Sequence, residues 1–532
     1  MAPKLPTEAE VHKAIKQLRR DSATAICNIS AVLLKEGGPQ VVSWLHRVIC
    51  MAFIAGRAPP DWKKAVLMPL HKKVCKLMCD HYRGIALLSI CGKAYTLVLL
   101  NRCRAAIERR LHEAQYGFRH GRGTGLQIFN VRKLVEMSRE FSAPMHMAFI
   151  DLRKAYDSVN RDAMWRVLSL YDVDATTVNL VKDLYDDGQM CVKLGKSVSS
   201  SFSVSTGVRQ GCILSPFLFN VYMDHVVRQI QAALPIHHGV EIAYRIGASL
   251  VPMSNLQRYN ERNLIQFLLY ADDMVLLCRN AEHMEIMLKV CDRVMEDWGL
   301  EINVGKTKVM SIDIHKVDPL PRICMRGEVV EEVDSFCYLG SIISSNASLD
   351  PEINKRICSA GAAFQKLRKR VFDDRHISLM VKMAVYKISI VPILLYGSET
   401  WALSKQQAHR LEVFQNNCLR SILGVSRADR VSVVELRQTC QQVSIANLCT
   451  KYRLRLLGHI ARMEGDYRLP KQLLHAVLPD LVRPRGRPHK SWNQVVFEDL
   501  AACRLSVGWS RLCMNKGEWR RRVATAVTGV PG

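Results

Sequence analysis

Residues 268–277 read LLYADDMVLL and place two adjacent aspartates, Asp272 and Asp273, between apolar runs. The runs predict two strands, 264–269 and 274–278, joined by Tyr-Ala-Asp-Asp. Two carboxylates about 4 Å apart repel by about 4 kcal/mol at an effective dielectric of about 20, so a purely structural hairpin gains nothing from the pair. A divalent cation would remove the repulsion, because hard oxygen ligands suit magnesium. Taken alone, the four residues also fit an ordinary polar turn.

A second apolar strand ends at another acid. Residues 149–159 read FIDLRKAYDSV, and the apolar stretch that begins after Pro144 ends at Asp151. The predicted strand, 145–151, is followed by a helix that Asn160 can cap. Asp151 is therefore the natural third ligand. Three carboxylates that hold two metal ions can activate an attacking hydroxyl and stabilise a leaving oxygen, which predicts phosphoryl-transfer chemistry.

Capping and periodicity signals organise the rest of the chain. Thr7 and Glu10 form a capping box before an apolar helical pattern. Ser215 before Pro216 predicts a helix over 217–230, with the serine at its cap. Further patterns predict helices to about residue 57 broken at 37–39, a strand at 65–70, a helix at 284–298 ended by Gly299, and a short strand at 300–304. The middle third is thus predicted to be α+β, and the chain from about residue 350 mainly helical.

The net charge indicates the kind of partner. The chain has 75 Lys and Arg against 49 Asp and Glu, a net charge of +26. This excess favours a polyanionic partner bound in a salt-dependent way, although a merely basic globular protein is the alternative. The longest apolar run, 388–396, has about half of the roughly 18 residues that a membrane span needs. The first residues, MAPKLPTEAE, contain no apolar signal core, so we predict an intracellular protein without a membrane partner.

Eighteen cysteines are scattered at irregular spacing. In a long chain without a secretory signal, this distribution predicts reduced thiols rather than a disulfide framework. HKKVCKLMCDHY contains one cluster that could hold zinc: His71, Cys75, Cys79 and His81. The zinc alternative lacks a second paired half at finger-like spacing.

The motifs around the acidic strands carry a specific resemblance. FIDLRKAYDSV, GVRQGCILSPFLFNVYMD at 207–224, LLYADDMVLL and GLEINVGKTKVM at 299–310 occur in this order. Together they resemble the reverse transcriptase domain of non-LTR (LINE-type) retrotransposons. Other stretches are similar to its fingers motifs (DHYRGIALLSICGKAYTLVLLNR at 80–102, YGFRHGRGTGLQIF at 116–129), its primer-grip hairpin (DSFCYLGSIIS at 334–344), and its thumb and C-terminal region (YGSETWALSKQQAHRLEVFQNNCLRSILG at 396–424, RLLGHIARMEGDYRLPKQLL at 455–474).

The resemblance, which covers nearly the entire chain, implies an α+β right-hand polymerase fold. The palm would be an antiparallel sheet packed on helices, and the thumb would be helical. The implied parts are fingers and N-terminal helices at 1–145, a palm with the catalytic motifs at 146–320, a primer-grip hairpin at 321–348, a thumb at 349–450 and a basic C-terminal nucleic-acid-binding segment at 451–532.

The resemblance also implies roles for individual residues. Asp151, Asp272 and Asp273 would hold two magnesium ions, for which manganese could substitute. Tyr156 would face the sugar of the incoming nucleotide and disfavour a ribose 2′-hydroxyl; the alternative is an ordinary aromatic core residue. Lys306 would sit near the leaving pyrophosphate as a counter-charge or proton donor; the alternative is a solvated surface lysine.

Two further segments would contact nucleic acid and triphosphate. Arg209 and Gln210 would contact the template and the incoming nucleotide, in a loop whose flanking glycines let the backbone come close. Lys72 or Lys73, with Arg83, would cradle the triphosphate from the fingers. A general basic surface is nearly as good an account of the two lysines.

The implied function is RNA-directed DNA polymerisation, in which a primer 3′-hydroxyl attacks the α-phosphate of a dNTP and pyrophosphate leaves. The implied partners are an RNA template, a DNA primer and dNTPs, and the implied compartment is the nucleus or the cytoplasm. Because the chain begins a few residues before the first helix, no endonuclease domain is expected. The alternative is a catalytically inactive or domesticated nucleic-acid-binding remnant. An RNA-dependent RNA polymerase would share the acids, but Tyr156 argues against it.

The C-terminal end has its own charge pattern. The last 82 residues hold 16 Lys and Arg against 6 Asp and Glu, which predicts a distinct basic module. RPRGRP at 483–488 resembles an AT-hook core, whose flat Arg-Gly-Arg stretch can enter the narrow minor groove of A·T-rich DNA. The alternative is a basic linker before a helix anchored by Trp492.

Overall fold

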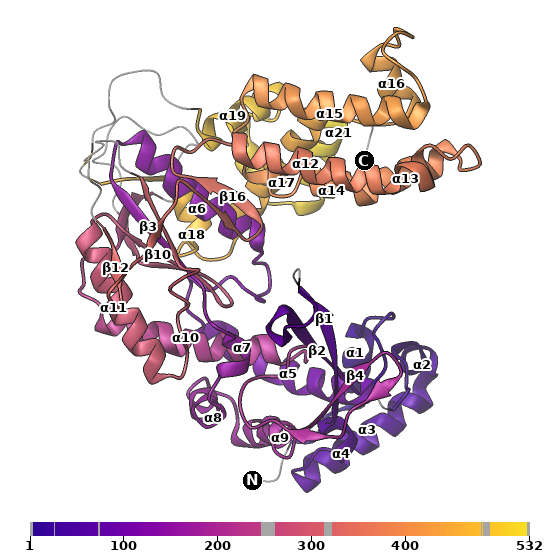
Figure 1. The fold of residues 1–532 in the computed structure, drawn as a ribbon, viewed down its shortest axis with the longest axis vertical. Coiled ribbons are helices and arrows are strands. Elements are labelled where there is room, and N and C mark those ends of the chain that lie inside the picture. The colour runs from indigo at the N-terminus through magenta and orange to yellow at the C-terminus, as the bar shows by residue number, and fades with distance from the viewer. Residues whose placement is uncertain are drawn as a thin grey trace.

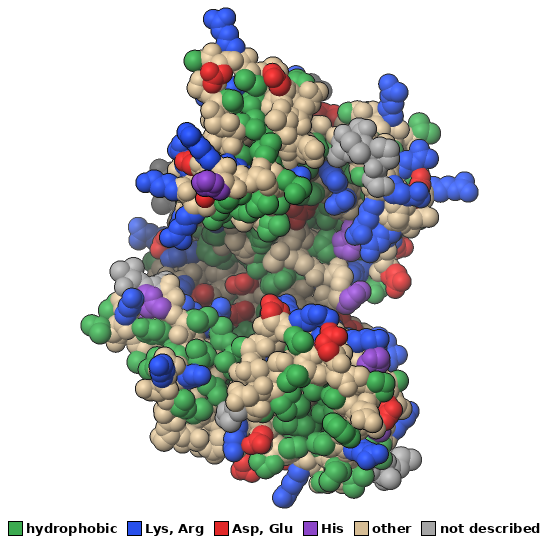
Figure 2. All heavy atoms as spheres, turned by 90° about the vertical axis from the view of Figure 1, so that its right-hand side faces the viewer, with side chains coloured by type: hydrophobic (Ala, Val, Ile, Leu, Met, Phe, Trp, Pro, Cys, Tyr) green, Lys and Arg blue, Asp and Glu red, His purple; other side chains and the backbone are tan. Residues whose placement is uncertain are grey.

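The computed structural model describes residues 4–25, 27–72, 75–245, 261–312, 322–479, 481 and 490–528. Figure 1 shows an N-terminal lobe (mainly residues 4–112 and 171–206), a central region (mainly 113–170 and 207–312) and a helical C-terminal lobe (mainly 350–528). The chain curves so that both lobes project to the same side of the central region. A hollow lies between the lobes, and acidic side chains are visible inside it (Figure 2).

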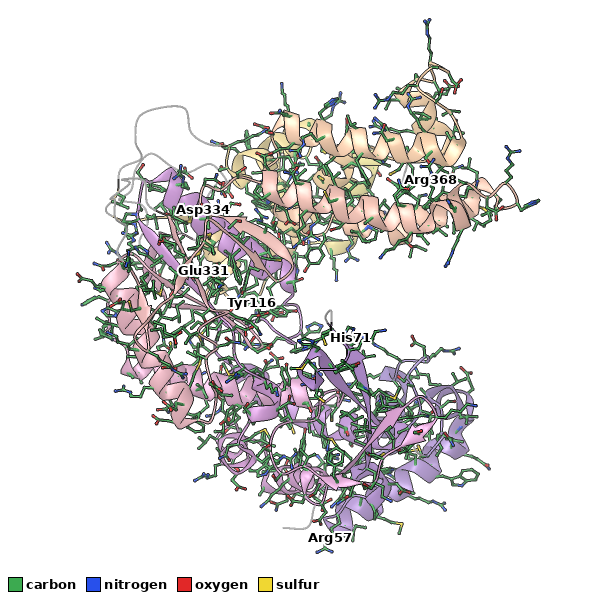
Figure 3. All side chains as sticks on the ribbon, in the orientation of Figure 1. Arg57, His71, Tyr116, Glu331, Asp334 and Arg368 are labelled. Carbon is green, nitrogen blue, oxygen red and sulfur yellow. The ribbon has the colours of Figure 1, made fainter. Side chains whose placement is uncertain are left out.

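The N-terminal lobe is built on a small mixed sheet. β1 (Ala65–His71) pairs antiparallel with β2 (Tyr82–Leu88) and parallel with β4 (Gln189–Leu194). The other elements are α1 (Glu8–Gln17), α2 (Ala31–Glu36), α3 (Gly38–Ala55), α4 (Pro60–Lys63), η1 (Cys79–His81), α5 (Ile90–Arg110), α9 (Ala175–Tyr185), β5 (Ser197–Val198) and β6 (Phe202–Ser203). The predicted capping box of Thr7 and Glu10 is present at α1. His71 lies at the tip of this lobe that faces the C-terminal lobe (Figure 3).

A central sheet of the described chain carries the acid-bearing strands in the order β14-β11-β3-β10-β9. Its strands are β3 (Met145–Ile150), β9 (Phe267–Tyr270), β10 (Asp273–Cys278), β11 (Lys308–Ile312) and β14 (Glu331–Glu332). β3 lies in the middle, antiparallel to both β10 and β11, and all of its residues are buried. A strand covered on both faces has no polar side, which explains its near-continuous apolar sequence.

The two faces of β3 belong to different cores. Ala148 and Ile150 pack in one core with α10 (Ser215–Ala233) and α11 (Ala281–Asp297). Met147 and Phe149 pack in a second core with α6 (Thr124–Glu140) and helices of the C-terminal lobe. The short helices α7 (Ala155–Ser158) and α8 (Arg161–Ser169) follow β3 and lead toward the N-terminal lobe. The two faces of the sheet therefore take part in two different cores, one of which extends into the N-terminal lobe and the other into the C-terminal lobe.

A hairpin leads from the sheet to the C-terminal lobe. Its strands are β15 (Ser335–Tyr338) and β16 (Ser341–Ser344), and the Phe336 ring stacks on the Phe149 ring with centroids 4.2 Å apart. The remaining strands are β7 (Val240–Tyr244), β8 (Glu261–Ile265), β12 (Cys324–Met325), β13 (Glu328–Val329) and β17 (Ala476–Val477). The helices of the lobe are α12 (Asp350–Leu367), η3 (Arg368–Phe372), α13 (Leu379–Ser389), α14 (Val391–Leu394), η4 (Ser398–Thr400), α15 (Lys405–Leu423), α16 (Val433–Thr439), α17 (Ile445–Ala461), α18 (Leu469–Leu474), α19 (Trp492–Ala502), α20 (Trp509–Leu512) and α21 (Lys516–Thr528).

The basic C-terminal segment is part of the core rather than a separate module. The predicted start at residue 451 falls inside α17. Trp492 and Trp519 are almost completely buried, and both belong to the core that includes Met147 and Phe149 of β3. The AT-hook-like residues 483–488 lie outside the described residues.

Three predicted elements differ in the structure. The strand predicted at 264–269 is two strands, because β8 joins a sheet with β7 and β17 while β9 joins the central sheet. Ser215 does not cap α10: the cap position is Leu214, and the Ser215 hydroxyl lies 3.0 Å from the Tyr185 hydroxyl. The strand predicted at 300–304 is only an isolated bridge between Leu152 and Ile302.

The cysteines are all free thiols, and nine of the eighteen are buried. In the cluster weighed as a zinc site, His71 Nε2 and His81 Nδ1 instead lie 3.3 Å and 3.0 Å from the Cys75 carbonyl oxygen. Among the helices that the structure describes, none combines the length and apolar content that crossing a bilayer requires.

Candidate active site

The turn between β9 and β10 brings the three predicted aspartates to one edge of the central sheet. Asp273 pairs with Tyr270 across the turn, and Met274 pairs with Ile150 of β3. Continuing this antiparallel register by one residue sets Asp273 opposite Asp151, where facing Cα atoms lie about 5 Å apart. Ala271 takes a left-handed backbone conformation with φ of 57°, which makes the reversal tight.

The pKa values report the crowding of negative charge. Burial raises the pKa of Asp272, and the nearby Asp151 adds to the rise while Arg83 opposes it. Burial, together with the charges of Asp272 and Asp151, raises the pKa of Asp273 to about 6. Asp273 is exposed to solvent, whereas Asp272 is half-buried. The carboxylates therefore repel one another, as the sequence predicts, and a cation between them would be attracted.

Lys306 forms an ion pair with Asp151. Its Nζ lies 3.2 Å from Asp151 Oδ2, and both side chains are exposed. The Asn303 amide donates to the Asp151 carbonyl oxygen (2.8 Å), and the Lys306 amide donates to the Asn303 carbonyl oxygen (3.1 Å). The segment before β11 is thus fastened to the end of β3, and this places the lysine beside the carboxylates.

The donor chemistry of this edge suits a hard divalent cation. Three carboxylates that repel one another provide the oxygen ligands that magnesium prefers. Across the described ranges, no three His, Cys, Asp or Glu side chains already stand in a metal-holding arrangement. Asp151 is paired with the Lys306 ammonium instead. The residues fit a metal in kind, and the Asp151 carboxylate would have to share its charge between the lysine and the ion.

Tyr156 lies beside the carboxylates. Tyr156 lies in α7, which follows Asp151 in the chain. Its ring stacks on the Phe219 ring of α10, with centroids 4.3 Å apart and an interplanar angle of 14°. Burial raises the pKa of Tyr156, and Asp272 is the next cause. The half-buried ring therefore stands within electrostatic reach of the acids while it packs against the core. Both predicted roles, sugar contact and packing, are compatible with this position.

The loop at 207–211 is pinned closely to its neighbours. Gly207 has φ of 72°, and a Cβ there would lie 2.6 Å from the Asp157 carbonyl oxygen. Gly211 has φ of 109°, and a Cβ there would lie 2.4 Å from the Ala86 carbonyl oxygen. Only glycine avoids both the strain and the contact. The loop therefore depends on both glycines for its approach to α7 and β2.

The Gln210 side chain remains partly accessible to solvent, whereas the Arg209 side chain is buried. The Gln210 side chain is half-buried and donates to Asp157 Oδ1 at 3.2 Å. Arg209 is only 5% exposed, and its guanidinium donates to the Leu184 carbonyl oxygen at 2.6 Å. Because the guanidinium also lies over the Tyr185 ring, the predicted template contact does not fit the Arg209 side chain. Arg209 supports the loop from behind.

The basic residues predicted to hold the triphosphate are only partly placed. Arg83 is exposed on β2, and its positive charge lowers the pKa of both Asp272 and Tyr156. Arg83 therefore lies on the side of the acids. Lys72 is exposed just after β1, where its amide donates to the His81 carbonyl oxygen at 2.7 Å. Lys73 lies outside the described residues. Arg83 therefore faces the acids from the N-terminal lobe.

Gln115 is a site residue that sequence reasoning missed. Its fully buried side chain accepts hydrogen bonds from the amides of Ala271 (2.9 Å) and Gly117 (2.8 Å). A Cβ on Gly117 would lie 2.4 Å from the Ala271 nitrogen. Gln115 and Gly117 thus clamp the acidic turn from a segment far away in the chain. Nothing in AQYGF distinguishes the glutamine from a surface residue, so no sequence signal could have found it.

The reverse transcriptase (RNA-dependent DNA polymerase) family model matches residues 70–343. The chain is 26% identical over 429 residues to "Probable RNA-directed DNA polymerase from transposon BS" of Drosophila melanogaster (78% of this chain, 44% of that protein). It is 21% identical over 433 residues to "RNA-directed DNA polymerase from mobile element jockey" of the same species (79% and 44%). It is 24% identical over 355 residues to "Retrovirus-related Pol polyprotein from type-1 retrotransposable element R2" of Popillia japonica (65% and 45%). The matched region spans less than half the length of each relative.

Proposed function

The chain belongs to the reverse transcriptase (RNA-dependent DNA polymerase) family, and we propose on that premise that it extends a DNA primer with dNTPs along an RNA template. The relatives named above are polymerases or polyproteins of mobile elements, which supports a non-LTR retrotransposon origin. The observation that carries the proposal is the strand register that sets Asp151 against Asp273, with Asp272 beside them. Three carboxylates at one end of a sheet destabilise the fold by repulsion, but they can hold the metal ions that phosphoryl transfer uses.

Asp151, Asp272 and Asp273 would hold two magnesium ions, or manganese in their place. When bound, the ions would lower the charge on the reacting phosphate and favour ionisation of the primer hydroxyl. The raised pKa values of Asp272 and Asp273 support this assignment, because a nearby cation would relieve the repulsion that raises them. Lys306 would then face the leaving pyrophosphate, where its ammonium can balance charge or deliver a proton.

Nearby side chains would position the nucleotide. Tyr156 would stand under the sugar and exclude a 2′-hydroxyl by contact, and its stacking on Phe219 would keep the ring from yielding. Gln210, held by Asp157, would contact the nucleotide or the template base. Arg83, with Lys72, would hold the triphosphate from the N-terminal lobe. In this arrangement the lobe acts as fingers, the central region as palm, the β15–β16 hairpin as primer grip, and the C-terminal lobe as thumb.

Primer extension tests the proposal. Purified protein should extend a DNA primer on an RNA template with dNTPs and Mg²⁺ or Mn²⁺, and poorly with rNTPs. Asp272→Ala should abolish extension and leave primer–template binding unchanged. The matched control, Asp297→Ala, removes an exposed aspartate at the end of α11 and should extend normally. Preferential use of rNTPs would reject the sugar preference, and binding without extension would favour a catalytically inactive remnant.

A further inference from the structure

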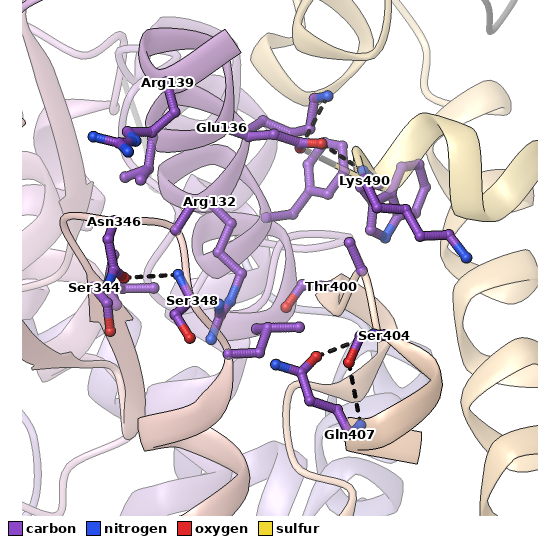
Figure 4. Close-up of a pocket in the computed structure, with 18 residues that line it drawn as sticks. Arg132, Glu136, Arg139, Ser344, Asn346, Ser348, Thr400, Ser404, Gln407 and Lys490 are labelled. Atoms are coloured by element: carbon purple, nitrogen blue, oxygen red, sulfur yellow. Dashed lines mark hydrogen bonds and ion pairs between the residues drawn. The ribbon is translucent and has the colours of Figure 1, made fainter. Parts of the chain in front are cut away.

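A second cavity lies behind the β15–β16 hairpin, among α6, β16 and the starts of α12, α15 and α19 (Figure 4). Its volume is about 490 Å³, within the range of small-molecule sites. None of the three catalytic aspartates lines it. The cavity is therefore lined by residues other than the acids of the candidate active site.

The cavity wall is positively charged. Arg132, Lys133, Arg139 and Lys490 line it, against one acid, Glu136. Glu136 is already committed, because its carboxylate lies 3.2 Å from the Lys133 ammonium and accepts from the Trp492 amide at 2.5 Å. The Lys490 ammonium pairs with Glu498 at an exposed position, where an ion pair is weak. Arg132, Arg139 and Lys490 remain to attract an anion.

Two buried polar atoms in the wall point to a ligand. Ser344 is 5% exposed, and its Oγ has no hydrogen-bond partner among the residues that the structure describes. The same holds for Arg132 Nε within those ranges. The terminal nitrogen of Arg132 donates to Ser341 Oγ (3.1 Å) and to the Ile342 carbonyl oxygen (2.8 Å), which leaves Nε for another acceptor. An unpaired buried donor is costly, and a phosphate oxygen would satisfy it.

The rest of the cavity suits a flat apolar group. Phe129, Ile343 and Leu349 line it beside the polar wall. The Phe129 ring meets the Trp492 ring edge to face with centroids 4.9 Å apart, which makes this side rigid. The long helices α12 and α15 also begin here, although the first turn of α12 already contains Asp350 and Glu352 and the start of α15 is already capped by Ser404 and Gln407. A cation-rich wall beside a rigid apolar one fits a ligand that joins a phosphate to a ring.

We propose that this cavity is a second nucleotide site, which binds a nucleoside phosphate apart from the catalytic aspartates. The ligand is either a free mononucleotide or one nucleotide of a strand, since the two share the same recognised chemistry. Arg132 connects the cavity with the hairpin, whose Phe336 ring stacks on Phe149 next to the acid-tipped end of β3. An occupant would therefore touch the same hairpin that borders the catalytic site from its other face.

Photo-crosslinking without divalent metal tests the site independently of polymerisation. One arm uses 8-azidoadenosine 5′-monophosphate in EDTA, and the other a 5′-phosphorylated single-stranded DNA with one 8-azidoadenine. The test variant is Arg139→Ala with Lys490→Ala. Its matched control is Arg57→Ala with Arg511→Ala, which removes two exposed arginines outside the cavity wall; Figure 3 shows Arg57 at the far end of the N-terminal lobe. Ala402→Phe introduces a bulky ring at the cavity wall and keeps its charges.

We expect cross-links in peptides containing 129–139, 343–349 or 400–407. The double variant should weaken labelling about tenfold or more, since it removes two charge-assisted contacts, and the control should match the parent. Ala402→Phe should prevent labelling. Labelling in only one arm would identify the source of the nucleotide. Labels confined to other peptides, or parental labelling in Ala402→Phe, would overturn the proposal. If the double variant does not fold, Ala402→Phe decides alone.

Discussion

Replacing Asp273 by asparagine should stabilise the metal-free protein at neutral pH. The folded state raises the pKa of Asp273 from its usual 3.8 to about 6. The folded protein therefore binds a proton more readily than the unfolded chain, and its stability falls as pH rises through this window. Below about pH 4 the penalty is absent, and above about pH 6 it is complete. Asparagine carries no charge and should escape the penalty.

The size of the effect follows from the pKa. A rise from 3.8 to about 6 corresponds to at most about 3 kcal/mol at 1.36 kcal/mol per pH unit. Because Asp273 is exposed, solvent screening should reduce this to about 1 kcal/mol. The asparagine variant should therefore be more stable than the parent by about 1 kcal/mol near pH 8 and equal to it near pH 4.

Urea unfolding in EDTA across this pH range measures the difference. Asp297→Asn removes the same charge from an exposed position and serves as the control. Saturating Mg²⁺ should stabilise the parent and remove the advantage of the variant, because ligand binding to the folded state adds stability. A difference that is absent, opposite in sign or independent of pH would refute the argument that the carboxylates crowd one another.

Three further changes test the roles of single residues. Gln115→Leu should lower stability by about 2–4 kcal/mol, because two buried hydrogen bonds are lost, and urea unfolding would measure this. Primer extension should also decrease although all three carboxylates are intact, and unchanged extension would rule out a clamp on the turn. Tyr156→Ala should raise rNTP incorporation relative to dNTP by about tenfold or more, as single-nucleotide extension would measure, whereas an unchanged ratio would leave only the packing role. Arg209→Met should lower stability by about 1–3 kcal/mol and leave primer–template affinity unchanged in a fluorescence titration; weakened affinity in a folded variant would restore the template contact.

The acidic edge was predictable because its signals are local. Apolar runs that end at Asp151 and surround Asp272 give both the strands and the sites of unfavourable charge, and β3 and β10 lie where the pattern puts them. Their pairing in one sheet follows from burying both runs in a common core. The roles of Tyr156 and Lys306 stay predictions, although each side chain lies beside the acids.

The remaining features depend on tertiary contacts that no local pattern reveals. The apolar run at 264–269 looks like one strand, but its two halves enter different sheets at the buried Gln266. That glutamine donates to the His238 carbonyl oxygen at 2.8 Å, a partner that only the fold supplies. Arg209 looks like a nucleic-acid ligand because it is charged and lies in a glycine-flanked loop. Its burial against Tyr185 is visible only in three dimensions.

The clamp by Gln115 bears on how copies of such a sequence lose their activity over time. Because the shape of the acidic turn depends on a neutral residue in a distant segment, we predict that a single substitution there lowers polymerase activity even where all three aspartates are intact. Surveys that count competent copies by the acids alone would then overestimate them. A census that also requires glutamine and glycine at the positions of Gln115 and Gly117 should agree better with measured activity.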